Sequence, residues 1–71
     1  MRTWLKDLRK QKRMTQKDLA QSVGVTESYI CNIENGKRGC SVDFLIRVGN
    51  ATHKKPEVLM RKEIEYLKEA T

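Results

Sequence analysis

The chain has 71 residues, of which 15 are Lys or Arg and 9 are Asp or Glu, so its formal net charge is +6. Such a length predicts a single domain over residues 1–71 with limited burial. The sequence contains no apolar run that could span a membrane, nothing that resembles a secretory signal peptide, and too few cysteines for a disulfide framework. We therefore expect a cytoplasmic protein without membrane association.

The positive charge is concentrated at the N-terminal end. Residues 1–13 contain six basic side chains against one acid, Asp7, whereas residues 14–53 are balanced and residues 54–71 are nearly so. A smaller basic cluster lies at Lys37 and Arg38. A basic surface favours a polyanionic partner, because each neutralised phosphate releases counterions. The alternative is that the lysine-rich helix faces are only exposed to solvent and bind no partner.

The first predicted helix runs from Trp4 to Lys12, with Leu5, Leu8 and the stem of Lys12 on one face. Thr15 is typical of the N-cap of a second helix, and Asp18 completes a capping box. Gly24 supplies the backbone freedom for a sharp exit.

A third helix follows directly, with Thr26 as its N-cap, Ile30 and Ile33 on its buried edge, and Asn35-Gly36 as its stop. Its outward side carries small polar groups, namely Glu27, Ser28, Tyr29 and Asn32. Two short helices joined by a tight turn over about 15–35 have the helix-turn-helix layout, and such a face fits the major groove of DNA. Helical hairpins also occur as plain core, so the residues alone leave both interpretations open.

Ser41 is the N-cap expected for a fourth helix, and Pro56 suits the first turn of a fifth, over about 56–70. Apolar residues recur along this last helix at helical spacing, although Glu63 interrupts the stripe. Few core positions remain for Ile64, Tyr66 and Leu67, so we expect these three residues to contact a second copy of the chain. The alternative is that the helix folds back over its own domain.

The stretch LKDLRKQKRMTQKDLAQSVGVTESYICNIENGKRGCSVDFLIRVGNA closely resembles the lambda-repressor-like, Cro-type (XRE) family of DNA-binding domains. The resemblance covers roughly residues 4–59 and rests on several motifs at fixed mutual spacing. These are Leu8-Arg9, Met14-Thr15-Gln16, Leu19-Ala20, Val23-Gly24-Val25-Thr26, Ile30, Ile33-Glu34-Asn35-Gly36-Lys37-Arg38 and Ser41. It implies an all-α, five-helix fold, here with a C-terminal helix longer than the family's short one.

The chain departs from the family pattern in its fourth helix. Gly49 and Thr52 stand where the family usually has alanine and leucine, which leaves volume that Trp4 or Tyr66 is a candidate to fill. Glycine within a helix also costs about 1 kcal/mol relative to alanine. His53 occupies the position of the glycine that usually stops this helix, and we interpret it as a partner of the helix dipole, not as a ligand.

The resemblance also assigns roles to individual residues. Arg9 and Glu34 match a partly buried ion pair that orients the recognition helix; the alternative is two unrelated surface charges. Contacts to DNA phosphates are implied for Gln16, Thr26, Tyr29, Asn35, Lys37 and Arg38. Contacts to base edges are implied for Glu27, Ser28 and Asn32, with Cys31 at the margin.

Two of these residues have alternative roles. Glu27 is nearly as well explained as a carboxylate that stabilises the N-terminus of its helix, because phosphates repel an acid. Cys31 invites a redox switch, but an inert thiol is the simpler interpretation, since nothing nearby in the sequence lowers its pKa.

The sequence predicts no enzymatic activity, cofactor or metal site, since it has one histidine and no readable set of nucleophile and base. The favoured function is a sequence-specific transcriptional regulator, a small homodimeric repressor on an inverted repeat in double-stranded DNA. The runner-up is an antitoxin or accessory DNA-binding module whose C-terminal helix binds another protein. A non-specific architectural DNA binder is the third candidate.

Overall fold

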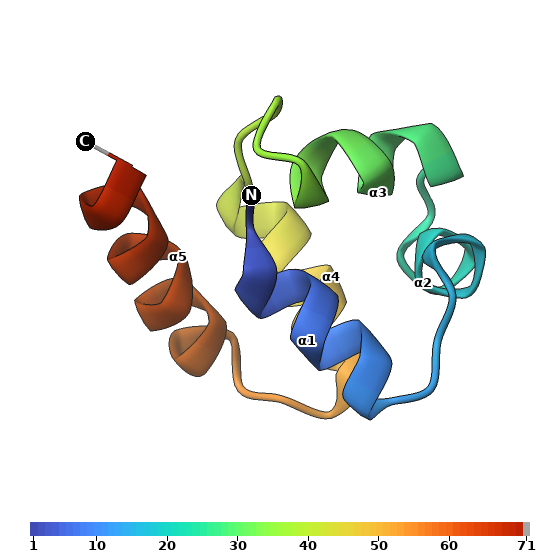
Figure 1. Ribbon diagram of the computed structural model, residues 1–71. Coiled ribbons are helices and arrows are strands. Elements are labelled where there is room, and N and C mark those ends of the chain that lie inside the picture. The colour runs from blue at the N-terminus through green and yellow to red at the C-terminus, as the bar shows by residue number, and fades with distance from the viewer. Residues whose placement is uncertain (71) are drawn as a thin grey trace.

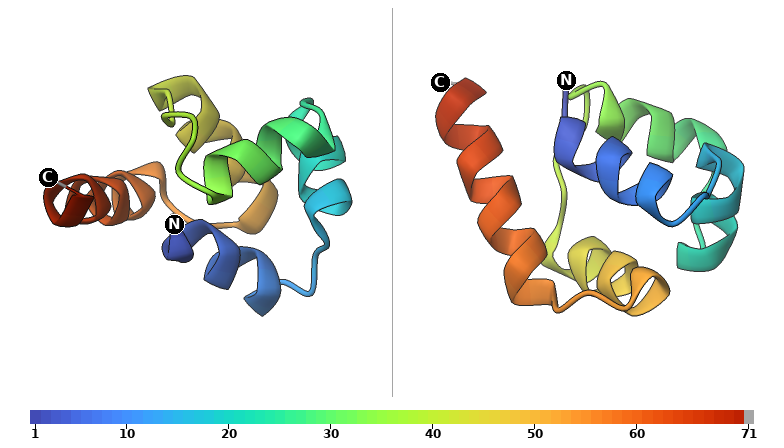
Figure 2. Two further views of the ribbon diagram at one scale, coloured as in Figure 1. Left: turned by 45° about the horizontal axis from the view of Figure 1, so that its top comes forward. Right: turned by 60° about the horizontal axis from the view of Figure 1, so that its bottom comes forward.

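The computed structural model describes residues 1–70, and within them the chain forms an all-α bundle of five helices, as predicted (Figure 1). The helices are α1 (Thr3–Gln11), α2 (Gln16–Val23), α3 (Glu27–Glu34), α4 (Val42–Thr52) and α5 (Pro56–Ala70). In all three views α5 lies on one side of the bundle and α2 on the other, with α1, α3 and α4 between them (Figures 1 and 2).

Side-chain caps define the start of the three middle helices, which confirms the capping predictions. Thr15 accepts a hydrogen bond from the Asp18 amide, and the Asp18 carboxylate accepts one from the Thr15 amide, so the capping box is complete. Thr26 caps α3 through the Tyr29 amide, and Ser41 caps α4 through the Phe44 amide. These bonds satisfy amides that a helix start leaves without an internal acceptor.

Helix α1 begins and ends one residue earlier than the sequence predicts. Lys12 lies in the following turn and is exposed, so the expectation that its stem lies on the core face is wrong. The turn is fixed by Arg13, whose φ of 57° is in the left-handed region, and by amide bonds from Lys12 and Arg13 back to carbonyls of α1.

The buried apolar side chains of all five helices form one cluster. Its members are Leu5, Leu8, Leu19, Ala20, Val23, Ile30, Ile33, Phe44, Leu45, Val48 and Leu59. Within the described part of α5 only Leu59 belongs to it, so this helix contributes to the core mainly through its N-terminal half. Over residues 1–70, none of the helices combines the length and the apolar composition that crossing a membrane requires.

The volume expected at Gly49 is filled by the backbone of the α4–α5 link, so at this position the prediction that Trp4 or Tyr66 fills it is wrong. A Cβ atom at Gly49 would lie 2.7 Å from the carbonyl oxygen of Lys54 and 3.5 Å from Pro56. The Lys54 amide in turn donates to the Gly49 carbonyl at 3.0 Å. His53 makes this reversal with a φ of 58°, the left-handed conformation for which glycine is usually used.

Candidate nucleic-acid interface

The turn between α2 and α3 is fixed by its own backbone and by a side chain of α4. Gly24 adopts a φ of 77°, and the Val25 amide donates to the Ala20 carbonyl at 3.0 Å. Arg47 of α4 donates to the Val23 carbonyl at 3.3 Å, so a third helix supports the end of α2. The angle between α2 and α3 is therefore fixed by a left-handed glycine and a side-chain bond from α4.

The residues predicted to contact bases occupy the outward side of α3. Glu27 and Ser28 lie in its first turn and are exposed, and Cys31 and Asn32 follow one turn later and are half-buried. This spacing brings the four side chains to one side of the helix. Glu27 is also in the position where a carboxylate stabilises a helix N-terminus, so both interpretations of it agree with its location.

Arg9 and Glu34 form a two-bond ion pair between α1 and the end of α3. Arg9 Nε and Nη2 donate to the Glu34 carboxylate at 2.7 and 3.3 Å, and Arg9 Nη1 donates to the Met14 carbonyl at 2.8 Å. Gln16 Nε2 donates to Glu34 Oε1 at 3.1 Å. A side-chain amide nitrogen has two N–H donors, so this bond leaves Gln16 chemically able to contact a phosphate.

The residues that follow α3 form a basic turn, which we define as residues 35–38. Asn35, Lys37 and Arg38 are exposed there, and Gly36 has a φ of 80°. The Arg38 guanidinium lies 4.6 Å from the centre of the Tyr29 ring, a cation–π contact that orients it. Tyr29 itself packs against Phe44 with ring centres 5.8 Å apart.

Two of the six basic side chains in residues 1–13 are committed to internal ion pairs. Arg9 binds Glu34, and Arg2 binds Glu63. The positive charge that residues 1–13 offer to a polyanion is therefore smaller than the sequence count indicates. Lys10, Lys12 and Arg13 are exposed.

Sequence reasoning missed a second ion pair, which lies at the centre of what we define as the Arg2 cluster: Arg2, Trp4, Glu63 and Tyr66. Arg2 is only 2% exposed. Its Nε and Nη2 donate to the two Glu63 oxygens at 2.7 and 3.0 Å, and Trp4 Nε1 donates to Glu63 Oε1 at 3.0 Å. The Arg2 guanidinium also lies 4.5 Å from the centre of the Tyr66 ring. The sequence signal for this ion pair is Glu63, a charged residue within the apolar stripe of the last helix, because a buried charge requires a partner.

The three residues predicted to contact a second copy differ in exposure. Ile64 and Leu67 are 53% and 50% exposed, whereas Tyr66 is half-buried against Arg2. Of these three, Ile64 and Leu67 therefore present apolar surface freely within this chain.

The two cysteines lie in different environments. Cys31 accepts a hydrogen bond from Asn35 Nδ2 at 3.4 Å, on the exposed side of α3. Burial raises the pKa of the Cys40 thiol to about 12, which keeps that side chain protonated and unreactive at neutral pH.

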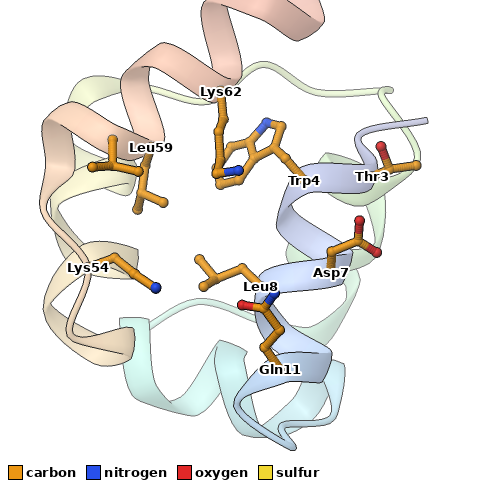
Figure 3. A pocket seen from close by; sticks show the side chains of 9 residues that line it. Thr3, Trp4, Asp7, Leu8, Gln11, Lys54, Leu59 and Lys62 are labelled. Atoms are coloured by element: carbon orange, nitrogen blue, oxygen red, sulfur yellow. The ribbon is translucent and has the colours of Figure 1, made fainter.

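A cavity of about 390 Å³ lies between α1 and α5 (Figure 3). Trp4 and Leu8 line it from α1, and Leu59 and Lys62 line it from α5. None of its lining residues belongs to α2 or α3. Among residues 1–70 we find no group of three or more His, Cys, Asp or Glu side chains placed to hold a metal ion.

Two short helices at a fixed angle, with an exposed polar face on the second and a basic turn after it, define a helix-turn-helix DNA-binding domain. The family model described as "Helix-turn-helix" matches residues 5–59. The chain belongs to the XRE family of helix-turn-helix proteins and is a DNA-binding transcription regulator. It is 32% identical over 65 residues to the "ImmF control region 10 kDa protein" of Bacillus phage phi105, covering 92% of this chain and 72% of that protein.

Proposed function

We propose that this protein is a repressor that binds an inverted repeat as a homodimer, with α3 of each copy in the major groove. The observation that supports this is the combination of exposed polar side chains in the first turns of α3 with the basic turn at its end. Base edges are reached from the N-terminal part of a recognition helix, while flanking basic and polar groups bind phosphates. The phage relative is named after a control region, which agrees with a regulatory role.

Base readout is assigned to three side chains. Asn32 offers the paired donor and acceptor that adenine requires, Glu27 accepts from the amino group of cytosine, and Ser28 serves several bases. Cys31 lies at the margin of this face. The phosphate contacts are assigned to Gln16, Thr26, Tyr29, Asn35, Lys37 and Arg38.

The first experiment is a selection of bound sequences from a random DNA library at physiological salt. We expect enrichment of an inverted repeat whose half-site centres are about one helical turn, roughly 34 Å, apart. No enrichment, with binding that salt readily abolishes, would contradict sequence-specific binding and favour the architectural alternative.

Two variants separate the assigned roles on the selected site. Asn32→Ala should relax the preference at one or two base pairs, each worth roughly 1–3 kcal/mol. Lys37→Ala should weaken binding to all sequences alike and reduce the salt dependence. Lys55→Ala is the matched control, because it removes the same charge from the α4–α5 link, at the end of the molecule away from α3 (Figure 1). Identical specificity profiles for the wild type and Asn32→Ala would contradict the role of Asn32.

The homodimer is tested through the exposed apolar residues of α5. Replacing Ile64 and Leu67 together by lysine should convert a dimer into a monomer in sedimentation velocity, because two charges would then face the proposed interface. Glu65→Lys places a lysine at an exposed position of the same helix and is the matched control. A wild-type monomer that selects a single half-site would contradict the homodimer, and α5 would then be left for a different protein, as in an antitoxin or accessory module.

A further inference from the structure

The Arg2 cluster joins the last helix to the end of α3 and to the last residue of the basic turn. Arg2 Nη1 donates to the carbonyl of Ile33, just before the turn, and to that of Arg38, its last residue, the latter at 3.0 Å. The Arg2 amide donates to the Glu34 carbonyl at 2.7 Å. Figures 1 and 2 show the N-terminus beside the end of α3 in every view. One residue thus binds three carbonyls at the C-terminal end of the recognition helix and the end of the turn.

Helix α5 supports this arrangement from the opposite side. Glu63 binds the guanidinium through both carboxylate oxygens, so the plane of the Arg2 side chain is fixed. The Tyr66 hydroxyl lies against Gly36, where a Cβ atom would be 2.6 Å from it. The turn is therefore in contact with α5 at its glycine, while Arg2 binds the last two residues of α3, just before the turn, and the last residue of the turn.

The chemistry of Arg2 suits positioning more than general stabilisation. Its guanidinium uses a planar set of donors to reach two carbonyls and one carboxylate at the same time, which the ammonium group of a lysine cannot reproduce. A positive charge at the C-terminal end of α3 also complements the helix dipole. A buried ion pair contributes little net stability compared with apolar packing of the same volume. The distinctive effect of this one is the geometry that it imposes on the turn.

We propose that Arg2 is a positioning residue for DNA binding, which holds the basic turn in the conformation that contacts phosphate and transmits the position of α5 to that turn. This inference rests on the proposed role of Lys37 and Arg38 as phosphate contacts. Arg2 itself is buried and does not touch DNA. A change in how α5 packs therefore changes DNA affinity without altering any residue on the DNA-facing surface.

The test compares Arg2→Lys and Glu63→Gln with Val48→Ala, a control that removes buried methyl groups from α4 and leaves the turn untouched. All measurements are made on the full chain at a temperature where circular dichroism shows each variant to be fully folded. Amide hydrogen exchange of Gly36 and Lys37, which bond to the Ile33 and Asn32 carbonyls at 3.1 and 2.9 Å, reports on the turn without DNA. Fluorescence anisotropy with the selected DNA gives Kd and its salt dependence.

We expect Arg2→Lys and Glu63→Gln to accelerate exchange at these two amides and to weaken DNA binding about tenfold. The salt slope should fall by roughly one for each phosphate that the turn no longer binds. Val48→Ala should accelerate exchange generally and leave Kd and the salt slope unchanged. A loss of global stability alone does not alter the salt slope of a folded protein, so this measurement separates positioning from stabilisation.

Three results would overturn the inference. Unchanged exchange at Gly36 and Lys37 in Arg2→Lys would show that Arg2 does not hold the turn. Faster exchange with an unchanged Kd and salt slope would show that the held conformation does not matter for binding. Equal DNA binding by the wild type and Lys37→Ala would contradict the phosphate contact of Lys37. The proposed function of the turn would then fail, whatever the exchange data show about Arg2.

Discussion

Replacing Gly49 by alanine tests whether the close approach of the α4–α5 link controls this position. Alanine is the better helix former, and in an exposed helix the substitution would add about 1 kcal/mol to the free energy of unfolding. Here the new Cβ would lie 2.7 Å from the Lys54 carbonyl oxygen, which belongs to the backbone and cannot rotate away. The Lys54 amide is bonded to the Gly49 carbonyl, so the link cannot shift without stretching that bond.

The two effects have opposite signs, and the clash is the larger. Overpacking of a tight site costs typically 1–3 kcal/mol. After subtraction of the helix-propensity gain we expect Gly49→Ala to lower the free energy of unfolding by up to roughly 2 kcal/mol. For a domain of this size that corresponds to a fall in Tm of up to about 16 °C. Thermal unfolding followed by circular dichroism at 222 nm measures it, and urea unfolding checks that the transition remains two-state.

Asn50→Ala is the matched control, because Asn50 is exposed on the next position of the same helix. It should raise the free energy of unfolding by roughly 0.5 kcal/mol through helix propensity alone. If Gly49→Ala also raised Tm, the contact between Gly49 and the link would be too loose to require glycine, and the reasoning would be refuted.

Three further substitutions test other positions. His53→Gly should raise the free energy of unfolding by about 0.5–1 kcal/mol in a thermal melt, because it removes left-handed strain at a φ of 58°, whereas His53→Ala should give no gain. Arg9→Ala should lower the free energy of unfolding by roughly 2–3 kcal/mol and weaken DNA binding, because the substitution leaves the buried Glu34 carboxylate without its ion partner. Unchanged thermal stability would contradict this. Hydrogen bonds from the Thr15 backbone and side chain lower the pKa of Asp18. The stability advantage of the wild type over Asp18→Asn should therefore be complete above the ordinary aspartate pKa of about 4 and disappear as the pH falls through the lower folded-state value, which urea unfolding at several pH values would measure.

The parts of the fold that were predictable from the sequence are those specified by neighbouring residues. The start of α2 follows from Thr15 and Asp18, three positions apart, and the caps of α3 and α4 follow the same local rule. Helix periodicity then identifies the core faces. The helix-turn-helix layout needs only these short-range signals and the glycine between the helices, which is why the amino-acid sequence alone indicates it.

The parts that were not predictable depend on residues far apart in the chain. Glu63 is recognisable in the sequence only as an interruption of an apolar stripe, because nothing near it identifies Arg2 as its partner. From the sequence, Gly49 likewise predicts an unfilled volume in the core. In the structure, glycine is required there because the backbone of the α4–α5 link passes close to it at Lys54. The assignment of Ile64 and Leu67 to a second copy remains a prediction, since their exposure is consistent with any apolar partner.

The ion pair between Arg2 and Glu63 also has a kinetic consequence. The two residues are 61 positions apart, so forming their contact closes a loop of almost the entire chain. The entropy of that closure delays the contact until the local helices and the α2–α4 core have assembled. Interactions that form after the folding transition state act mainly on the unfolding rate. This ion pair is therefore expected to lengthen the lifetime of the native state while leaving the speed of folding nearly unchanged.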